Sequence, residues 1–356
     1  ELLREKKKVI AVTGSHGKTT ASALLSHIFN EAGTRPTAAI GGEVFNFRSN
    51  FLVGEGSYFI IEADESDGSF LKFYPDCAVL LNIDREHLDY FKDISNAMAA
   101  YKSFIGNVKK NGCVYYNADD KHLNRIFDAY CGRSVTFGMK AGSDVKAIDI
   151  TQSGLKMYFK CLLRGEKIAG TFSISLPGSH NITNALAAIA VAVDAGIDFE
   201  IIKRALASYK GVKRRFEIKN TGGGIMLVED YAHHPAEIKA VLRACAPFNR
   251  NIIAVFQPHR YTRTKDLFED FLNCFKTADY LILTDIYAAS EKVIKGFTAK
   301  RLFAEMKRAG AKKVECVEKD AVAGRVKHIA KKGDIVLILG AGDIGDVAAE
   351  LEAMLS

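Results

Sequence analysis

Short apolar runs alternate with helical patterns along the first half of the chain. Residues 9–13, 58–63 and 77–83 are mostly apolar, which is typical of buried strands. Apolar positions at helical spacing predict helices at 19–32, where Gly33 and Pro36 end the pattern, and at 95–108. Strands that alternate with helices in this way predict a parallel sheet covered on both faces.

The pattern changes between residues 144 and 175, where apolar and polar positions alternate around the turn residues Gly154 and Gly165. This predicts antiparallel hairpins, and a helix at 182–195 follows them. We interpret residues 210–212 as a linker, because the alternation of strand and helix then resumes. The predicted fold class is α/β in two domains. Residues 1–211 hold a mostly parallel sheet with a small antiparallel hairpin sheet, and residues 212–356 form a smaller Rossmann-like α/β domain.

Length and composition agree with two globular domains. The chain has 356 residues, of which 48% are hydrophobic and 26% charged. No apolar run is long enough to span a bilayer, and no secretory signal is present. Seven scattered cysteines without a C-x-x-C pair indicate reduced thiols in a cytoplasm. A net charge of +7 suits an anionic substrate, although a lysine-rich surface explains it as well, and no signature of nucleic-acid binding accompanies it.

The first candidate site is the glycine-containing loop at residues 14–20, between a predicted strand and a predicted helix. Such a loop lets backbone N–H groups approach phosphate oxygens at the positive end of a helix. Lys18 would reach the terminal phosphates, and the hydroxyl of Thr19 would bind Mg²⁺. The loop is shorter than the general phosphate-loop pattern, so a glycine turn with an exposed lysine stays open as the alternative. The predicted nucleotide-binding residues here are Gly14, Ser15, His16, Gly17, Lys18, Thr19 and Thr20.

Acidic residues follow two predicted strands near this loop. Residues 62–67 (EADESD) contain four carboxylates, and residues 82–87 (NIDREH) end the next strand. Ligands bind at the carboxyl ends of strands in α/β sheets, and carboxylate oxygens suit Mg²⁺. Metal ions there would neutralise charge during phosphoryl transfer. The alternative is a solvated acidic loop.

The second domain has two polar centres at strand ends. Residues 229–235 (EDYAHHP) offer carboxylates and a histidine pair, and in residues 256–264 Arg260 and Arg263 could hold a carboxylate. Helix caps with exposed basic residues are the alternative, and zinc is disfavoured because no third soft ligand is near. Residues 340–345 match G-x-G-x-x-G, but no βαβ unit follows them, so we predict a tight turn rather than a dinucleotide site.

Taken together, the motifs resemble those of the Mur ligases, in the family's order along nearly the whole chain. The resemblance implies an ATP- and Mg²⁺-dependent ligase of peptidoglycan precursor synthesis. It implies that L-alanine is joined to the lactoyl carboxylate of UDP-N-acetylmuramate through an acyl phosphate. The segments that carry the resemblance are residues 12–19 (VTGSHGKT), 62–67, 82–90 (NIDREHLDY), 180–185 (HNITNA), 214–216 (RRF), 230–235 (DYAHHP) and 257–264 (QPHRYTRT).

The resemblance also implies roles for single residues. Lys18, Glu62, His87 and His233 would be catalytic, and Thr19, Glu62 and His87 would bind metal. Lys102 follows His87 at a spacing that suits the carbamoylated lysine of some members. The remaining roles are Asn181 and Asn184 at the adenine, Arg215 at the phosphates, Asp230 at the ribose, and His259, Arg260 and Arg263 at the incoming amino acid.

Several alternatives remain open at this point. Mur ligases normally begin with a UDP-binding domain, whereas this sequence starts at Glu1, almost at the ATP-binding strand, so we expect that domain to be missing from it. A related ligase that adds a whole tripeptide to the same sugar is the alternative within the family, although residues 257–263 favour the alanine-adding form. Folylpolyglutamate synthase fits the second-domain motifs poorly. A nucleotide-binding fragment without ligase activity is the alternative outside enzymes. The expected partners are small molecules, without nucleic acid or membrane.

Overall fold

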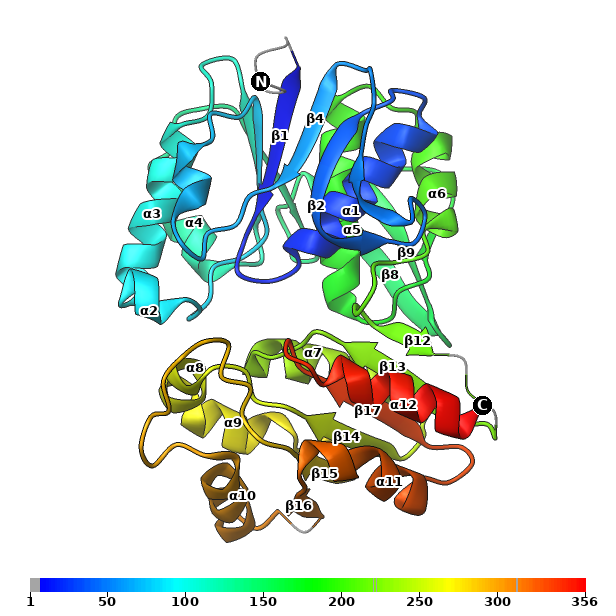
Figure 1. Cartoon of the computed structure of the whole chain (residues 1–356). Coiled ribbons are helices and arrows are strands. Elements are labelled where there is room, and N and C mark those ends of the chain that lie inside the picture. Colours follow the sequence, from blue (N-terminus) through cyan, green and yellow to red (C-terminus); the bar gives the residue numbers. More distant parts are fainter. Residues whose placement is uncertain (1–6, 220, 222, 312) are drawn as a thin grey trace. The chain divides into compact units, whose positions relative to one another are not determined.

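The chain folds into two compact units, each built on its own sheet. The computed structural model describes residues 7–219, 221, 223–311 and 313–356. The units are Glu1–Lys213 and Arg214–Ser356, coloured blue to green and green to red in Figure 1. Within the described ranges, no helix combines the length and the apolar character that crossing a membrane requires.

The first unit is organised around β1 (Lys8–Thr13), which pairs in parallel with β4 and β5. Five of the six β1 residues are buried, which explains the apolar run in the sequence. The strand order is β10-β9-β8-β7-β6-β5-β1-β4-β2-β3, with β11 beside β9. The other strands are β2 (Thr37–Val44), β3 (Ser49–Leu52), β4 (Tyr58–Glu62), β5 (Cys77–Leu80), β6 (Cys113–Asn117), β7 (Ser134–Gly138), β8 (Val145–Ser153), β9 (Lys156–Leu163), β10 (Glu166–Lys167) and β11 (Phe172–Ile174).

Helices cover both faces of this sheet, as the sequence predicted. On one face α1 (Lys18–Glu31), α5 (Ser179–Asp194) and α6 (Phe199–Ser208) pack together and share a core with β1 residues such as Ile10. On the other face α3 (Ile94–Gly106), α4 (Lys121–Phe127) and the short helix η1 (Ser69–Lys72) enclose a second core around Phe70 and Phe104. A short helix, α2 (Leu88–Phe91), lies beside α3. Loops at the carboxyl end of β1 are therefore held between two packed layers.

The predicted antiparallel hairpins are present, but they continue the large sheet. Strands β8 and β9 pair antiparallel, and β8 also pairs in parallel with β7, where Phe137 lies opposite Val145. Because β8 pairs with both β7 and β9, the hairpin extends the large sheet instead of forming a separate one.

The segment interpreted as a linker belongs to the first unit. Val212 is buried and pairs with Val44 of β2, and the N–H of Lys213 donates to the carbonyl of Glu43 at 2.9 Å. Backbone pairing with β2 thus carries the first unit to Lys213, and the second begins at Arg214.

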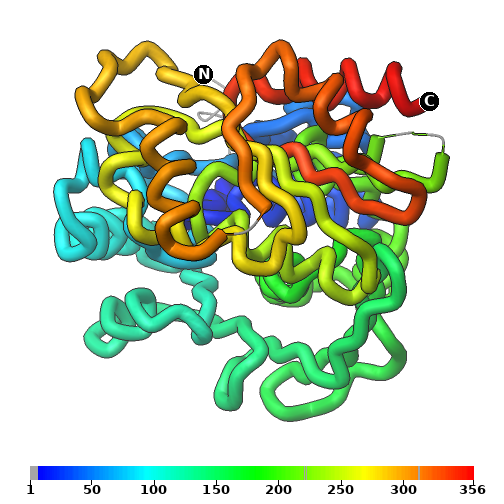
Figure 2. Tube along the Cα trace, turned by 90° about the horizontal axis from the view of Figure 1, so that it is seen from below, coloured from blue at the N-terminus to red at the C-terminus, as the bar shows by residue number. Residues whose placement is uncertain are grey.

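The second unit has a smaller sheet, with strand order β12-β13-β17-β14-β15-β16. All neighbours are parallel except β12 and β13, and the strands run side by side in Figure 2. Helices α11 (Lys319–Ile329) and α12 (Gly345–Leu355) pack with the sheet around Val336 and Ile338. The remaining elements are β12 (Glu217–Lys219), β13 (Met226–Asp230), α7 (Pro235–Cys245), η2 (Ala246–Phe248), β14 (Ile252–Phe256), α8 (Tyr261–Asp266), α9 (Phe268–Cys274), β15 (Tyr280–Leu283), α10 (Ala299–Arg308), β16 (Val314–Cys316) and β17 (Ile335–Leu339).

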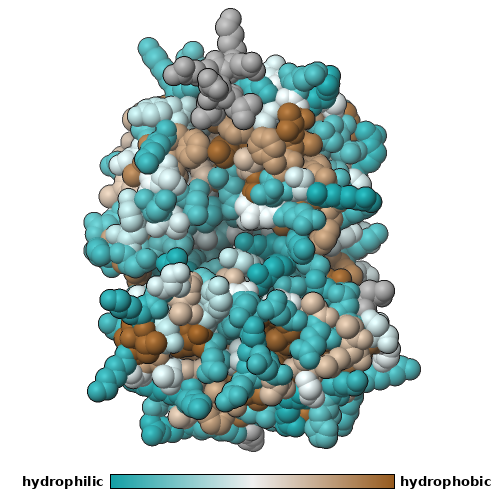
Figure 3. All heavy atoms as spheres, viewed as in Figure 1, coloured by the Kyte–Doolittle hydropathy of each residue, from teal (hydrophilic) through white to brown (hydrophobic). Residues whose placement is uncertain are grey.

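Hydrophilic residues cover most of the face drawn in Figure 3, and hydrophobic residues form several separate patches on it. The most exposed large hydrophobic side chains, Val53, Val293 and Tyr74, belong to three different loops. Single exposed apolar residues of this kind are ordinary for a folded protein.

Candidate active site

The loop between β1 and α1 is shaped by two glycines that no other residue can replace without a collision. Gly14 and Gly17 have φ angles of 142° and 87°, in the region that favours glycine. A Cβ on Gly14 would lie 2.9 Å from Cβ of Leu81, and one on Gly17 would lie 2.5 Å from Oδ1 of Asn184. The loop therefore keeps its path only because its turn positions lack side chains.

Asn82, just after β5, holds this loop through its side-chain amide. Its Oδ1 accepts the N–H of His16 at 2.8 Å, and its Nδ2 donates to the carbonyl of His16 at 2.9 Å. Its carbonyl also accepts the N–H of Ser15. Helix α1 begins at Lys18, and its N-cap residue, Gly17, provides no side-chain cap. The N–H groups of its first turn thus suit an anion, as phosphate-binding helix N-termini do.

Lys18, predicted to bind phosphate, lies against the buried carboxylate of Glu65. Its Nζ is 2.8 Å from Oε2 of Glu65 and donates to the carbonyl of Gly14 at 2.8 Å. Burial opposes the charge of Lys18, but the Glu65 carboxylate outweighs burial and raises the pKa of Lys18. The lysine is therefore charged at the loop. Its partner Glu65 belongs to the acidic segment 62–67, but no sequence signal distinguished it from the other acids there.

Thr19 and Glu62, both predicted metal ligands, are in direct contact. The Thr19 hydroxyl donates to Oε1 of Glu62 at 2.9 Å, and the N–H of Gly41 donates to Oε2 of Glu62 at 2.6 Å. The parallel register that places Val12 opposite Glu62 brings the end of β4 beside the loop. Two hard oxygen donors at this point fit Mg²⁺.

His87, the third predicted metal ligand, lies close to Glu65. Its Nε2 lies 3.7 Å from Oε1 of Glu65, and ligand atoms of Asp64, Glu65 and His87 all lie within 4.8 Å of one another. His87 has a φ of 52°, a left-handed conformation that is uncommon for histidine. Such backbone strain is found preferentially at functional sites.

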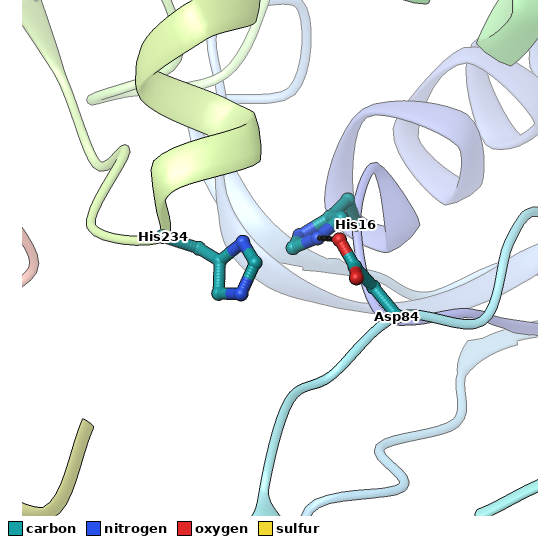
Figure 4. Close-up of side chains that lie close together, drawn as sticks. All are labelled: His16, Asp84 and His234. Atoms are coloured by element: carbon teal, nitrogen blue, oxygen red, sulfur yellow. Dashed lines mark hydrogen bonds and ion pairs between the residues drawn. The ribbon is translucent and has the colours of Figure 1, made fainter. Parts of the chain in front are cut away.

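His16 faces the acidic residues that follow β5. Its Nε2 lies 3.0 Å from Oδ2 of Asp84, as Figure 4 shows, and its Nδ1 lies 3.5 Å from Oε2 of Glu86. The hydroxyl of Ser15 accepts the N–H of Asp84 at 2.9 Å. The loop side chains Ser15 and His16 thus contact the segment after β5. The sequence pattern indicated the acids of this segment only as a group of potential metal ligands.

Asn181 and Asn184 lie at the start of α5, and both are buried. Asn184 contacts Gly17, while Nδ2 of Asn181 donates to the carbonyl of Pro177 at 2.8 Å. In this arrangement Asn184 shapes the phosphate loop, and its predicted role at the adenine stays a prediction. Lys102 lies exposed on α3, and its carbamoylation likewise stays a prediction.

In the second unit, Asp230 lies buried at the end of β13. Its Oδ2 accepts the N–H of Phe216 and its Oδ1 accepts the N–H of Ala232, both at 2.7 Å. Burial raises the pKa of Asp230 to about 6, although Arg215 and the two N–H groups act in the opposite direction. The guanidinium of Arg215 lies 4.9 Å from the ring centroid of Tyr231. Arg215 is thus close enough to Asp230 to act on its charge, and the roles predicted for the two residues at ATP stay predictions.

Three of the predicted amino-acid and amine residues also come together in this unit. The rings of His233 and His259 lie 5.6 Å apart, and Nη1 of Arg263 lies 3.0 Å from Nδ1 of His259. His233 Nδ1 lies 2.9 Å from the carbonyl of Tyr231. His234, which Figure 4 shows, caps α7: its Nδ1 accepts the N–H of Ala236. This histidine therefore has a structural role.

Residues 340–345 form the tight turn that the sequence predicted, between β17 and α12. Gly340 has a φ of 150°, and a Cβ there would lie 3.0 Å from the carbonyl of Gln257. The amide of Gln257 donates to Asp343 at 2.7 Å and accepts the N–H of Ile344. The glycines thus permit close packing against the end of β14.

The sheet, the loop and the acids that surround it are those of an α/β protein that binds a nucleotide. The Mur ligase middle domain matches residues 12–192, and the Mur ligase, glutamate ligase domain matches residues 214–342. The chain belongs to the Mur ligase family.

Individual members of the family are similar to nearly the whole chain. The UDP-N-acetylmuramate–L-alanine ligase of Geotalea daltonii is 43% identical over 353 residues, which cover 99% of this chain and 77% of that protein. The ligase of the same name from Syntrophotalea carbinolica is 42% identical, covering 100% of this chain and 78% of that one. The solved structure of UDP-N-acetylmuramate-alanine ligase from Thermotoga maritima has a TM-score of 0.83 at 27% identity, covering 99% and 76% of the two chains.

Proposed function

We propose that this protein joins L-alanine to the lactoyl carboxylate of UDP-N-acetylmuramate with hydrolysis of ATP to ADP and phosphate. The activity is that of its 43%-identical relative. The observation that carries it here is the phosphate loop, in which Lys18 and the Thr19–Glu62 pair meet at the start of α1. We propose the cytoplasm as its location, because the reaction consumes ATP and the seven cysteines are free thiols.

The chemistry begins with activation of a carboxylate. A carboxylate does not acylate an amine at neutral pH, because the departing oxide is a poor leaving group. The lactoyl carboxylate therefore attacks the γ-phosphorus of ATP, ADP departs, and an acyl phosphate forms. The amine of L-alanine then attacks the acyl carbon, and inorganic phosphate leaves. Catalysis of this kind depends mainly on positioning and on neutralising charge.

Residues of the first unit would serve the phosphoryl transfer. Lys18 and the N–H groups at the start of α1 would hold the terminal phosphates. Thr19 and Glu62 would hold Mg²⁺, with His87 at a second position, and the metal when bound neutralises charge on the phosphates. Asn181 and Asn184 would lie on the adenine side. This assignment is supported by the hydroxyl–carboxylate contact of Thr19 and Glu62.

Residues of the second unit would serve the nucleotide and the acceptor. Arg215 would neutralise phosphate charge, and Asp230 would bind near the ribose. His259, Arg260 and Arg263 would receive the carboxylate of L-alanine, and His233 would assist at the amine. The grouping of His233, His259 and Arg263 around one point of the unit supports this role.

An acceptor panel tests the function. The protein is mixed with UDP-N-acetylmuramate, ATP and Mg²⁺, and phosphate release is followed with L-alanine or with the tripeptide. We expect release with L-alanine, and its loss in Lys18→Ala. The matched control is Lys160→Ala, which removes an exposed lysine that also pairs with a carboxylate, Asp149. Turnover of Lys18→Ala at the wild-type rate would refute the assignment, and faster release with the tripeptide would favour the other ligase.

A further inference from the structure

The segment between β15 and α10 contains a tyrosine and a glutamate that the proposed site does not yet use. Tyr287 forms two backbone hydrogen bonds with the predicted acceptor motif at residues 257–264. Its carbonyl accepts the N–H of Arg260, and its N–H donates to the carbonyl of Pro258, both at 2.8 Å. These two hydrogen bonds form a parallel β-bridge between His259 and Tyr287, which extends the parallel pairing of β14 and β15. The two segments are therefore held in one register.

The ring of Tyr287 stacks on the imidazole of His259. Their centroids lie 5.6 Å apart and the rings are 11° from parallel, a separation within the range of favourable aromatic pairs. On the same imidazole, Nη1 of Arg263 lies 3.0 Å from Nδ1. A guanidinium can only donate, so Nδ1 is the acceptor and the ring proton lies on Nε2. Tyr287 and Arg263 together fix the plane and the tautomer of His259.

Glu291 holds the helix from which Arg263 projects. Its Oε2 accepts the N–H of Thr262 at 3.0 Å, and its Oε1 accepts the Thr262 hydroxyl at 2.6 Å. Helix α8 has no side-chain cap from its own N-cap residue, Arg260. Glu291 therefore supplies from outside the contact that fixes the first turn of α8.

The glycine turn at residues 340–345 makes room for Tyr287. A Cβ on Gly342 would lie 2.4 Å from Oε1 of Gln257, and 2.6 Å and 2.8 Å from Cγ and Cβ of Tyr287. The Cβ of Tyr287 is fixed by the backbone, so rotation of the side chain cannot move it away. The absence of a side chain at residue 342 thus allows the tyrosine ring to reach His259.

We propose that Tyr287 and Glu291 are positioning residues of the acceptor amino-acid site. Tyr287 holds the imidazole of His259 and Glu291 holds the first turn of α8, so that His259 and Arg263 are in place before the amino acid binds. Preorganisation of this kind lowers the cost of binding. The inference rests on the proposed function, because it assumes that residues 257–264 receive L-alanine.

Steady-state kinetics with L-alanine and ATP varied separately test the proposal. In Tyr287→Ala and Glu291→Ala we expect KM for L-alanine to rise about tenfold or more, with kcat and KM for ATP changed less than about threefold. Tyr287→Phe keeps the ring and should stay near wild type. The matched control is Val293→Ala on the same segment, whose side chain is 70% exposed.

Each outcome decides one question. An unchanged KM for L-alanine in Tyr287→Ala and Glu291→Ala overturns the proposal, as does an equal rise in KM for ATP, which indicates a general structural defect. Absence of alanine-dependent turnover in the wild type refutes the proposed function itself and this inference with it. If Tyr287→Ala does not fold, Glu291→Ala and Tyr287→Leu provide the same measurement, with Tyr287→Leu expected to raise KM for L-alanine.

Discussion

The ammonium group of Lys18 lies 2.8 Å from a carboxylate oxygen of Glu65, whose side chain is only 2% exposed. The charge of Lys18, which we propose holds phosphate, is therefore neutralised within the protein by the carboxylate of Glu65. A nucleotide that binds at the start of α1 must share Lys18 with Glu65 or replace it. The pair thus links the stability of the first unit to the occupancy of its phosphate loop.

The Lys18–Glu65 pair should show strong thermodynamic coupling. Glu65→Gln leaves the buried ammonium without its counter-charge, and we expect the free energy of unfolding to fall by about 3 kcal/mol. Lys18→Met should cost less, because Glu65 can take up a proton; burial raises its pKa. The double variant should lose less than the sum of the two, measured by denaturant unfolding. Additive losses would contradict the coupling. The exposed pair Lys160–Asp149 serves as the control and should show no measurable coupling.

The sequence predicted the phosphate loop because local signals suffice there. An apolar strand, a glycine turn and a helical pattern lie next to one another, and each is visible within twenty residues. Local signals do not reveal which of the two acids, Glu62 or Glu65, contacts Thr19 and which contacts Lys18. Both acids follow β4, but only the register between β1 and β4 determines that Glu62 meets Thr19 while Glu65 meets Lys18. That register is a tertiary property.

Strand β2 was missed for a physical reason that concerns the site. Its sequence contains Gly41 and Gly42, which normally weaken a strand pattern. The structure shows why a glycine stands there: a Cβ on Gly41 would lie 2.7 Å from a carboxylate oxygen of Glu62, and the N–H of Gly41 donates to that carboxylate. Likewise Tyr287 carries no motif of its own, and only its stacking on His259 reveals it.

Gly17→Ala should weaken nucleotide binding as well as stability. Residue 17 has a φ of 87°, and the added Cβ would collide with Asn184. Gly33→Ala is the matched control, because Gly33 has a φ of 74° but nothing within 4 Å of a Cβ. We expect Gly33→Ala to cost about 1 kcal/mol from backbone strain alone. Gly17→Ala should cost clearly more and weaken ATP binding about tenfold or more, measured by thermal unfolding and calorimetry. Equal stability losses and unchanged ATP binding would show that the contact with Asn184 is unimportant.

Thr19→Val should raise the Mg²⁺ concentration needed for half-maximal phosphate release. The change keeps the shape of the side chain but removes the hydroxyl that donates to Glu62 at 2.9 Å. We expect an increase of about tenfold or more, because one of two hard oxygen donors is lost, and Thr19→Ser should retain most of the affinity. The matched control is Ser26→Ala, which removes a hydroxyl of the same helix that donates to the carbonyl of Ser22 at 2.7 Å. A Mg²⁺ titration that does not distinguish Thr19→Val from Ser26→Ala would exclude Thr19 as a ligand.

Asp230 should make the second unit less stable as pH rises through the mildly acidic range. Burial raises the pKa of Asp230 from 3.8 to about 6, so the folded protein holds a proton that the unfolded chain has already released. The contribution of this group to the free energy of unfolding is therefore largest below pH 3.8 and declines until pH has passed about 6, by at most about 3 kcal/mol.

Asp230→Asn tests this prediction, because asparagine does not titrate. Other carboxylates add pH dependence of their own. The informative quantity is therefore the slope of the free energy of unfolding against pH, compared between variant and wild type from about pH 4 to 6. We expect the stability of Asp230→Asn to rise more with pH, or fall less, than that of the wild type. Asp149→Asn provides a control of opposite sign, since a hydrogen bond from Lys160 lowers the pKa of Asp149. Parallel pH profiles for wild type and Asp230→Asn would mean that Asp230 is ionised throughout this range and that its two backbone N–H contacts, not burial, determine its charge.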